Sequence, residues 1–398
     1  MRVKKMSSDP VVIVAAKRTP IGAFQGVFSS ASAPQLGAAA IAATIAETGI
    51  DAADVDQVLM GCVLPAGLGQ APARQAALAG GIPVGTPCTT VNKMCGSGMK
   101  TIMLGHDLLK AESAVVVVAG GLESMSNAPY LLPKARSGYR MGHQEVLDHM
   151  FFDGLQDPYE GEMMGFFAEN TADKYGFSRE AQDAFAIESV TRAQGAAAAG
   201  AFVAEIAPVT IKTRKAEVIV ANDETPGTVN IDKIPTLRAA FRKDGTVTAA
   251  SSSSISDGAS ALILMTASEA EKRGLEPLAT IIGHSSFAQE PAWFTTSPVA
   301  AIKNLHEKLG WSVDNVDLYE VNEAFAVVTM AAMVDVGIDH ANINVNGGAC
   351  ALGHPIGASG ARITTTLLHA LKARNLKRGV ASLCIGGGEA VAIGIEIN

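Results

Sequence analysis

The chain has 398 residues, of which 48% are apolar and 18% charged, and its formal net charge is −8. This length exceeds what one simple core usually holds, so two or three subdomains are expected. The composition is typical of a well-buried globular protein and excludes a disordered one. The acidic balance and the lack of a lysine or arginine block argue against a nucleic-acid partner. No apolar run is long enough to cross a membrane.

The five cysteines are an odd number and widely spread, so they do not suggest a disulfide framework. Free thiols suit a reducing compartment. Residues 1–10 carry three basic residues but no apolar core of a signal peptide, and residues 395–398 are not a peroxisomal address. We therefore expect a cytoplasmic protein, although a mitochondrial protein without its transit peptide would look the same.

The first informative elements surround Cys95. Residues 56–61 predict a short buried strand, and a second β-like run ends just before Cys95. Apolar residues at three- and four-residue steps from Met99 to Leu109 then predict a helix. A cysteine at such a turn faces the free N–H groups and positive end of the new helix, which favours thiolate over thiol. The alternative is a buried structural cysteine.

The same order of elements occurs twice. After the helix that begins at Ser97, a strand is predicted at 115–118, ending in Gly120 and Gly121. Residues 317–322 predict a second short strand, Ser359 begins a second amphipathic helix, and residues 381–384 predict the strand after it. Strand, helix and strand at matched spacing predict two βαβ units and therefore a duplicated α/β fold, with a parallel or mixed sheet in each half.

The pattern changes between the halves. Residues 127–157 are rich in proline and glycine and predict long loops, whereas Ser178 is a good N-cap for a helix that runs to about Ala199. Residues 204–213 and 216–220 are candidate strands, and residues 251–254 are four serines that form either a flexible linker or a ligand-binding segment. The predicted division is 1–125 with 249–276 as a discontinuous N-terminal half, 126–248 as an inserted loop domain, and 277–398 as the C-terminal half.

Two further segments carry reactive side chains. His354 lies in a glycine-rich turn at 346–360, and Cys384 ends a buried strand just before Gly386. Two thiols and an imidazole at glycine corners suit acyl transfer with carbon–carbon bond formation. Cys95 would attack an acyl thioester, His354 would take its proton, and Cys384 would move a proton at the α-carbon of a second thioester. Each residue alone also has a structural explanation, as a loop histidine or a core cysteine.

At this point the chain resembles the thiolase family, nearly end to end. The resemblance rests on the segments 15–22, 322–325, 346–360 and 383–388 together with the Cys95 motif. It implies duplicated βαβαβ halves in a layered α/β/α/β/α core, and it assigns the nucleophile, base and second thiol to the same three residues. It further implies one oxyanion hole made by the N–H groups of Cys95 and Gly386, and another made by His354 and a water held by Asn322.

The resemblance also implies contacts with the pantetheine arm of coenzyme A. The residues concerned are Ser253, Ala249, Phe241, Leu155, Met164, Ala324 and Phe325. Four places depart from the family pattern: Met163 stands where histidine is usual, Phe294 where a methionine is usual, Cys350 where an aliphatic residue is usual, and residues 388–390 lack a usual glycine. We expect no metal, because Cys350 and His354 have no second ligand pair, and no permanently bound cofactor. Coenzyme A thioesters are the expected substrates.

The activity implied first is acetyl-CoA C-acetyltransfer, the reversible condensation of two acetyl-CoA to acetoacetyl-CoA and CoA. The alternative is cleavage of longer 3-ketoacyl-CoA chains in β-oxidation, and either would belong to lipid and fatty acid metabolism. A ketoacyl synthase would not need Cys384, and a scaffold protein would not need the reactive set at all. The loop at 128–161 resembles the tetramer-forming loop of short-chain thiolases, so a homotetramer is expected.

Overall fold

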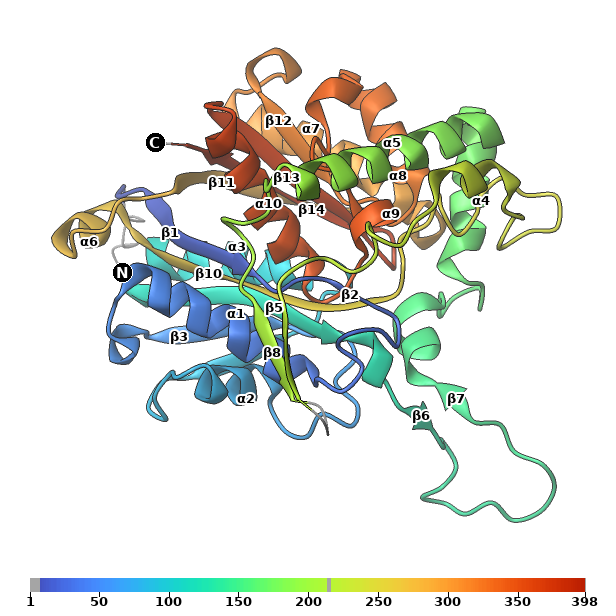
Figure 1. The fold of residues 1–398 in the computed structure, drawn as a ribbon, viewed down its shortest axis with the longest axis horizontal. Coiled ribbons are helices and arrows are strands. Elements are labelled where there is room, and N and C mark those ends of the chain that lie inside the picture. Colours follow the sequence, from blue (N-terminus) through green and yellow to red (C-terminus); the bar gives the residue numbers. More distant parts are fainter. Residues whose placement is uncertain (1–7, 213–215, 398) are drawn as a thin grey trace, which may run out of the picture.

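The computed structural model describes residues 8–212 and 216–397 and shows a layered α/β molecule (Figure 1). Its main sheet has the strand order β12-β13-β14-β11-β1-β10-β5-β3-β4, and β2 pairs with β10. The strands are β1 (Val11–Arg18), β2 (Gly22–Ala23), β3 (Gln57–Gly61), β4 (Cys88–Val91), β5 (Val116–Ser124), β10 (Ser256–Thr266), β11 (Ala279–Ala288), β12 (Leu318–Val321), β13 (Arg378–Ile385) and β14 (Glu389–Glu396). The helices are α1 (Ala33–Thr48), α2 (Pro72–Ala79), α3 (Ser97–Lys110), α4 (Met164–Tyr175), α5 (Arg179–Ala198), α6 (Ala267–Lys272), α7 (Ser297–Leu309), α8 (Ala326–Ala332), α9 (Ala349–Leu352) and α10 (Ser359–Ala373).

The sheet is mixed and contains the two predicted units. β3 is parallel to β4 and β5 in the first half, and β12 is parallel to β13 in the second. The remaining pairs along the main path are antiparallel. The halves meet where the start of β1 pairs with the start of β11, from Val11–Ile281 to Ile13–Ala279. The predicted layered α/β fold with two βαβ units is confirmed.

Helices α3 and α10 lie between the two halves and fill the central layer of the core. Met99 and Ile102 of α3 share one apolar cluster with Ile363 and Leu367 of α10. Helices α1 and α2 pack on the outer face of the first half, and α7 and α8 pack on the outer face of the second. Successive side chains of a strand point to opposite faces of the sheet. Both faces of the central strands are covered by helices, so these strands are apolar almost throughout.

Gly120 and Gly121 were predicted to end the strand before them, and this is wrong. Strand β5 continues through both glycines to Ser124. A Cβ on Gly120 would lie 2.1 Å from the Ser260 carbonyl oxygen, and one on Gly121 would lie 2.1 Å from the Gly357 carbonyl oxygen. The two glycines therefore allow neighbouring backbone to approach the strand, and they do not turn the chain.

The middle of the chain is less regular, as predicted. Ser178 caps α5 by accepting a hydrogen bond from the Ala181 N–H. The two candidate strands form a hairpin of β8 (Val209–Lys212) and β9 (Glu217–Val220), so the first is shorter than expected, and its residue 213 lies outside the described residues. Residues between β6 (Tyr130–Leu131) and β7 (Leu147–Asp148) form a long loop that extends away from the rest of the molecule (Figure 1).

Buried charges join this middle region to the first half. The fully buried Arg18 guanidinium at the end of β1 donates hydrogen bonds to Glu205, at 2.6 Å, and to both carboxylate oxygens of Asp223, at 2.7 and 2.9 Å. The bidentate pairing satisfies the cation where water cannot reach it. These contacts tie residues of the predicted insert to β1. The division into an insert and two halves stays a prediction. No helix in the two described ranges has the length and apolarity needed to cross a bilayer.

The close contact of α3 with α10 generates a prediction about stability. A Cβ on Gly360 would lie 2.3 Å from the Met99 backbone nitrogen, so Gly360→Ala should force the helices apart and lower the free energy of unfolding by about 1–3 kcal/mol. Gly195 of α5 is the control, because a Cβ there meets nothing within 4 Å. Gly195→Ala should leave stability unchanged or raise it by about 0.5–1 kcal/mol. Chemical denaturation of both variants would show the difference, and equal stabilities would contradict the close contact.

Candidate active site

Cys95 lies in the connection from β4 to α3. The residue before it, Met94, has a left-handed backbone with φ 46°, and the α3 N-cap is Gly96. The thiol is half-buried, and Met94 and Cys95 pack against an apolar cluster that includes Met125 and Ile356. The strained residue and the helix start place the sulfur between the halves, as the sequence predicted for a strand-to-helix turn.

His354 is buried in the glycine-rich turn before α10, and its hydrogen bonds define its tautomer. Its Nδ1 lies 2.5 Å from the Ser359 hydroxyl, which itself donates to the Pro355 carbonyl oxygen at 3.0 Å. Because that hydroxyl proton is already used, Ser359 Oγ accepts from Nδ1–H, and Nε2 carries the lone pair. Asn322 Nδ2 lies 3.5 Å from this Nε2. The Nε2 lone pair, which faces only this long contact, is what a general base requires.

Asn322 follows strand β12 and is 1% exposed. Its Oδ1 is buried and receives no hydrogen bond from the described residues. A buried amide oxygen without a partner is costly, so this atom is suited to accept from a water or a substrate group. Its neighbour Glu323 is tied elsewhere, to Ser189 at 2.7 Å, Asn344 at 2.8 Å and the Cys350 N–H at 3.0 Å.

Cys384 is fully buried at the end of β13, beside Cys95. Burial raises the pKa of Cys384 well above its usual value, and the charge of an ionised Cys95 nearby raises it further. The backbone N–H groups of Gly386 and of Cys95 itself hydrogen-bond to the Cys95 sulfur and act to lower its pKa. A Cβ on Gly386 would meet only Met164 Sδ, at 3.6 Å, so the missing side chain leaves space above these donors.

The protonation state of Cys95 differs from the sequence-based expectation. Burial raises the pKa of Cys95 to about 11, and the two backbone donors offset only part of that effect. Burial, followed by the positive charge of Arg362, lowers the pKa of His354 to about 3. The pair is therefore a neutral thiol and a neutral imidazole at neutral pH. The expected thiolate is wrong for the free protein, because removal from water outweighs a helix terminus.

Glu123 is a buried residue that sequence reasoning missed. Its carboxylate accepts hydrogen bonds from the N–H groups of Val63, Leu64 and Gly357, at 2.9, 3.1 and 2.8 Å. Burial, only partly offset by these bonds, raises its pKa to about 7. It joins the segment after β3 to the turn that carries His354. The signal that could have identified Glu123 is its position inside an apolar strand, because an acidic residue is seldom buried there without partners.

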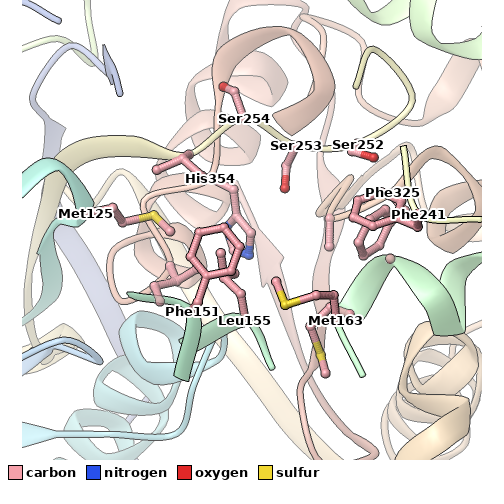
Figure 2. Close-up of a pocket in the computed structure, with 15 residues that line it drawn as sticks. Met125, Phe151, Leu155, Met163, Phe241, Ser252, Ser253, Ser254, Phe325 and His354 are labelled. Atoms are coloured by element: carbon pink, nitrogen blue, oxygen red, sulfur yellow. The ribbon is translucent and has the colours of Figure 1, made fainter. Parts of the chain in front are cut away.

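A cavity of about 190 Å³ opens beside His354. Figure 2 shows the His354 imidazole and the Ser253 hydroxyl pointing into it, with Phe241 and Phe325 on one side and Phe151 on the other. Six of the seven residues predicted to contact the pantetheine arm line the cavity, and Ala249 does not. The residues that were not predicted are Met125, Phe151, Met163, Gly165, Ser252, Ser254, Ile255 and Ile356.

The four departures from the family pattern differ in position. Met163 lines the cavity and contributes an apolar surface where a histidine was usual. Phe294 does not line it, and packs instead on Phe167 with ring centroids 6.4 Å apart. Cys350 is buried against the Glu323 backbone, with its Sγ 3.8 Å from the carbonyl oxygen. Glu389 forms an ion pair with Lys93, two residues before Cys95.

A half-buried thiol with two N–H donors aimed at its sulfur, a second thiol beside it, and an imidazole base that lines an apolar cavity define an acyl-transferring thiol enzyme. Family models support this class along the chain: the thiolase N-terminal domain matches residues 11–268 and the thiolase C-terminal domain matches residues 275–397. The chain belongs to the thiolase family.

Relatives match over nearly full length. The chain is 50% identical to an acetyl-CoA acetyltransferase of Pseudomonas aeruginosa, over 96% of this chain and 98% of the relative. It is 48% identical to one of Schizosaccharomyces pombe, over 98% of this chain and 100% of the relative. The crystal structure of the Bacillus anthracis acetyl-CoA acetyltransferase matches with a TM-score of 0.97 and 40% identity, and each chain is covered completely.

The raised pKa of Cys95 predicts how its alkylation depends on pH. Iodoacetamide reacts with the thiolate, so with a pKa of about 11 the rate constant should rise about tenfold per pH unit from pH 7 to 9. Mass spectrometry of the peptide that holds Cys95 would follow the rate, with the half-buried Cys88 as an internal reference. A rate that levels off near pH 7 would show that the thiolate already exists at rest.

Proposed function

We propose that the protein is an acetyl-CoA C-acetyltransferase that condenses two acetyl-CoA reversibly to acetoacetyl-CoA and CoA through an acetyl-Cys95 intermediate. The observation that carries this is a pair of neighbouring thiols, Cys95 and Cys384, together with His354 on the lining of an apolar cavity, in a chain whose thiolase relatives carry that activity in their names. Thiolase chemistry accounts for both thiols, whereas a ketoacyl synthase would leave Cys384 without a role.

In the first half-reaction Cys95 and His354 start as a neutral thiol and a neutral imidazole. His354 Nε2 accepts the Cys95 proton as the sulfur attacks the acetyl thioester, so charge develops only when a carbonyl is present. The carbon–sulfur bond to CoA breaks, and the CoA thiolate takes a proton from Cys384. This leaves acetyl-Cys95, an imidazolium at His354 and a thiolate at Cys384. The high resting pKa of Cys384 keeps it protonated until this step, so that a proton is present for the CoA thiolate to take.

In the second half-reaction the Cys384 thiolate takes a proton from the methyl group of the incoming acetyl-CoA. The resulting enolate carbon attacks the acetyl carbonyl, and Cys95 leaves as a thiolate that recovers its proton from His354. Acylation favours this step, because an acylated Cys95 cannot become the thiolate whose charge would oppose a Cys384 thiolate. All three side chains end in their starting protonation states.

Each half-reaction develops a negative oxygen that needs donors. The N–H groups of Cys95 and Gly386, which already point to the sulfur, suit the tetrahedral intermediate formed on it. The enolate oxygen would accept from protonated His354 Nε2 and from a water held by Asn322 Oδ1, the buried oxygen that has no partner among the described residues. Gly386 and Asn322 are therefore proposed site residues beside the three reactive side chains.

The apolar cavity suits the pantetheine arm of CoA, which is flexible and needs few polar anchors. We assign this contact to the six predicted residues that line the cavity. Acetyl-CoA, acetoacetyl-CoA and CoA are the proposed ligands, and the chemistry above requires no resident cofactor. A cytoplasmic location and a role in lipid and fatty acid metabolism are proposed with this activity.

We further propose a homotetramer assembled through the loop at 128–161. Large apolar side chains on this loop face solvent, including Tyr130 at 68%, Met141 at 91% and Tyr159 at 72% exposure. Apolar surface of this kind on an extended loop is typical of a contact with another chain. Light scattering at micromolar concentration measures the assembly, and a monomer would contradict the proposal.

Substrate length separates the proposed activity from its alternative. Because the acetyl group is small, acetoacetyl-CoA should be cleaved in the presence of CoA with a higher kcat/KM than 3-ketooctanoyl-CoA. The apolar residues Phe151, Met125 and Ile356 on one side of the cavity are the feature that would favour longer chains. Faster cleavage of the longer substrate would assign the protein to the broader 3-ketoacyl-CoA class.

The two thiols can be separated by mutation. Cys384→Ala should still form acetyl-Cys95 from acetyl-CoA but should lose condensation, and exchange of acetyl-CoA methyl protons with deuterated water, by about a hundred-fold or more. Mass spectrometry of the intact protein measures the first property, and product formation and NMR measure the second. Cys350→Ala is the matched control, because that thiol is equally buried but packs on Glu323.

Normal condensation by Cys384→Ala would place the α-proton base elsewhere, with Cys350 and Glu323 as the next residues to examine. Failure to form the acetyl adduct at all would give Cys384 a structural role. A loss in Cys350→Ala as large as that in Cys384→Ala would show that thiol burial, and not proton transfer, explains the defect.

A further inference from the structure

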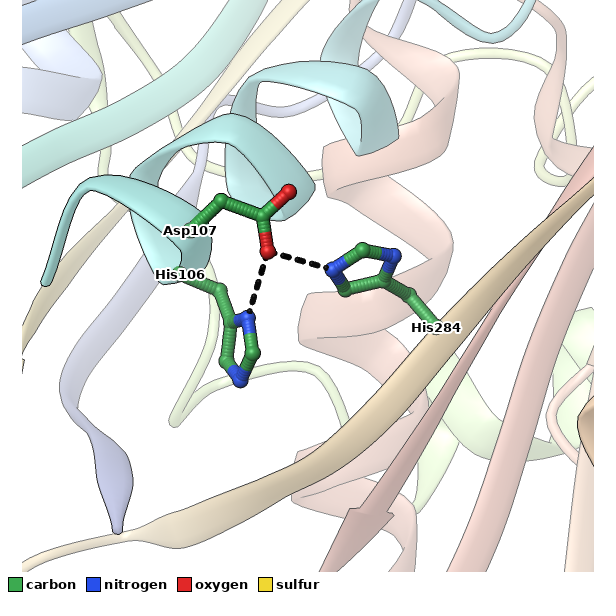
Figure 3. Close-up of side chains that lie close together, drawn as sticks. All are labelled: His106, Asp107 and His284. Carbon is green, nitrogen blue, oxygen red and sulfur yellow. Dashed lines mark hydrogen bonds and ion pairs between the residues drawn. The ribbon is translucent and has the colours of Figure 1, made fainter. Parts of the chain in front are cut away.

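His106, Asp107 and His284 converge at the end of α3 that lies away from Cys95. His106 and Asp107 lie near the end of α3, and His284 lies in β11 of the other half (Figure 3). Asp107 Oδ1 lies 3.0 Å from His106 Nδ1 and 2.9 Å from His284 Nε2. The two rings meet edge to face with centroids 5.1 Å apart. Three ligand-type atoms from two elements thus lie within 4.8 Å of one another.

The residue types of this triad suit a metal. Two imidazoles and one carboxylate form a common donor set for Zn²⁺. The Asp107 side chain is 48% exposed, so solvent can reach the open side and supply a fourth ligand.

Two of the three distances between the donor atoms, those from Asp107 Oδ1 to the imidazole nitrogens, are close to those of a zinc site. Zinc binds nitrogen and carboxylate oxygen at about 2.0–2.2 Å in a tetrahedron, which separates neighbouring ligand atoms by about 3.3–3.5 Å. The two printed contacts need to lengthen by only a few tenths of an ångström, and rotation of exposed Asp107 can provide that. One metal ion would then replace the two hydrogen bonds that join the three side chains.

Nearby cations restrict which metal can bind. Lys308 Nζ donates to the His284 carbonyl oxygen at 2.9 Å, and Lys110 ends the helix that carries His106 and Asp107. A hard cation held mainly by charge is repelled by these lysines, since Asp107 is the only acid of the triad. An ion held by directional bonds to imidazole nitrogen tolerates them better. The surroundings therefore favour Zn²⁺ or Co²⁺ over Mg²⁺ or Ca²⁺.

We propose that His106, Asp107 and His284 form a site for Zn²⁺ or a similar transition-metal ion, which links α3 of the first half to β11 of the second. The site is structural, because it lies at the opposite end of α3 from Cys95. It does not depend on the proposed acetyl transfer. Without the metal the same three groups are joined by hydrogen bonds from both imidazoles to Asp107.

The test measures metal binding by the full-length protein after treatment with a chelator. Calorimetric titration with Zn²⁺ and the thermal midpoint with and without Zn²⁺ are compared for the wild type, His284→Ala and Asp107→Asn. Asp107→Asn keeps the side-chain shape and removes the charged ligand. Loss of a direct ligand should weaken Zn²⁺ binding by about a hundred-fold or more, since even partners of ligands contribute ten- to a hundred-fold. His340→Ala, which removes a half-buried histidine elsewhere, should retain binding.

Cobalt distinguishes this site from the thiols, which also bind zinc. Co²⁺ in the proposed site should give ligand-field bands without sulfur-to-metal charge transfer, and these bands should disappear in both ligand variants. Zn²⁺ should raise the thermal midpoint of the wild type and of His340→Ala, but not that of His284→Ala. Equal Zn²⁺ affinity in all four proteins, a charge-transfer band as the only cobalt signal, or equal stabilisation by Mg²⁺ would each overturn the proposal.

Discussion

The contact between α3 and α10 is the constraint on which the site depends. Each helix belongs to a different half, and each begins directly after a segment that carries a reactive residue. A Cβ on Gly98 would lie 2.9 Å from the Ala361 backbone nitrogen, and a Cβ on Gly360 would lie 2.3 Å from that of Met99. Backbone therefore touches backbone where the helices start. Because both helices start at this contact, the loops that hold Cys95 and His354 are brought to one place, and neither half alone contains a nucleophile and its base.

Much of this arrangement could be predicted, because local patterns determine it. The repeated order of strand and helix, the N-cap at Ser178 and the glycine-rich turn around His354 all depend on neighbours in the sequence. Errors arose where distant segments decide the outcome. Gly120 and Gly121 were predicted to end their strand, but they lie within it, where the backbone at Ser260 and Gly357 passes against them.

Local sequence patterns also could not predict the protonation state of Cys95. The start of α3 favours a thiolate at Cys95, yet burial by both halves raises the pKa to about 11. Arg362, one α10 turn beyond Ser359, adds positive charge that helps keep His354 neutral. The buried pairing of Arg18 and of Glu123 could not be predicted either, because their partners come from distant segments. Motifs therefore identify the reacting atoms, whereas only the assembled core determines their charge.

The neutral thiol of Cys95 and the neutral imidazole of His354 affect how easily the enzyme is oxidised between turnovers. Peroxide converts a thiolate to sulfenic acid and reacts poorly with a thiol. With its pKa at about 11, Cys95 is ionised in only about one molecule in ten thousand at pH 7. The resting protein therefore protects its nucleophile from peroxide by keeping the sulfur protonated. Its vulnerable interval is confined to the moments when a thioester is bound and the proton has moved to His354.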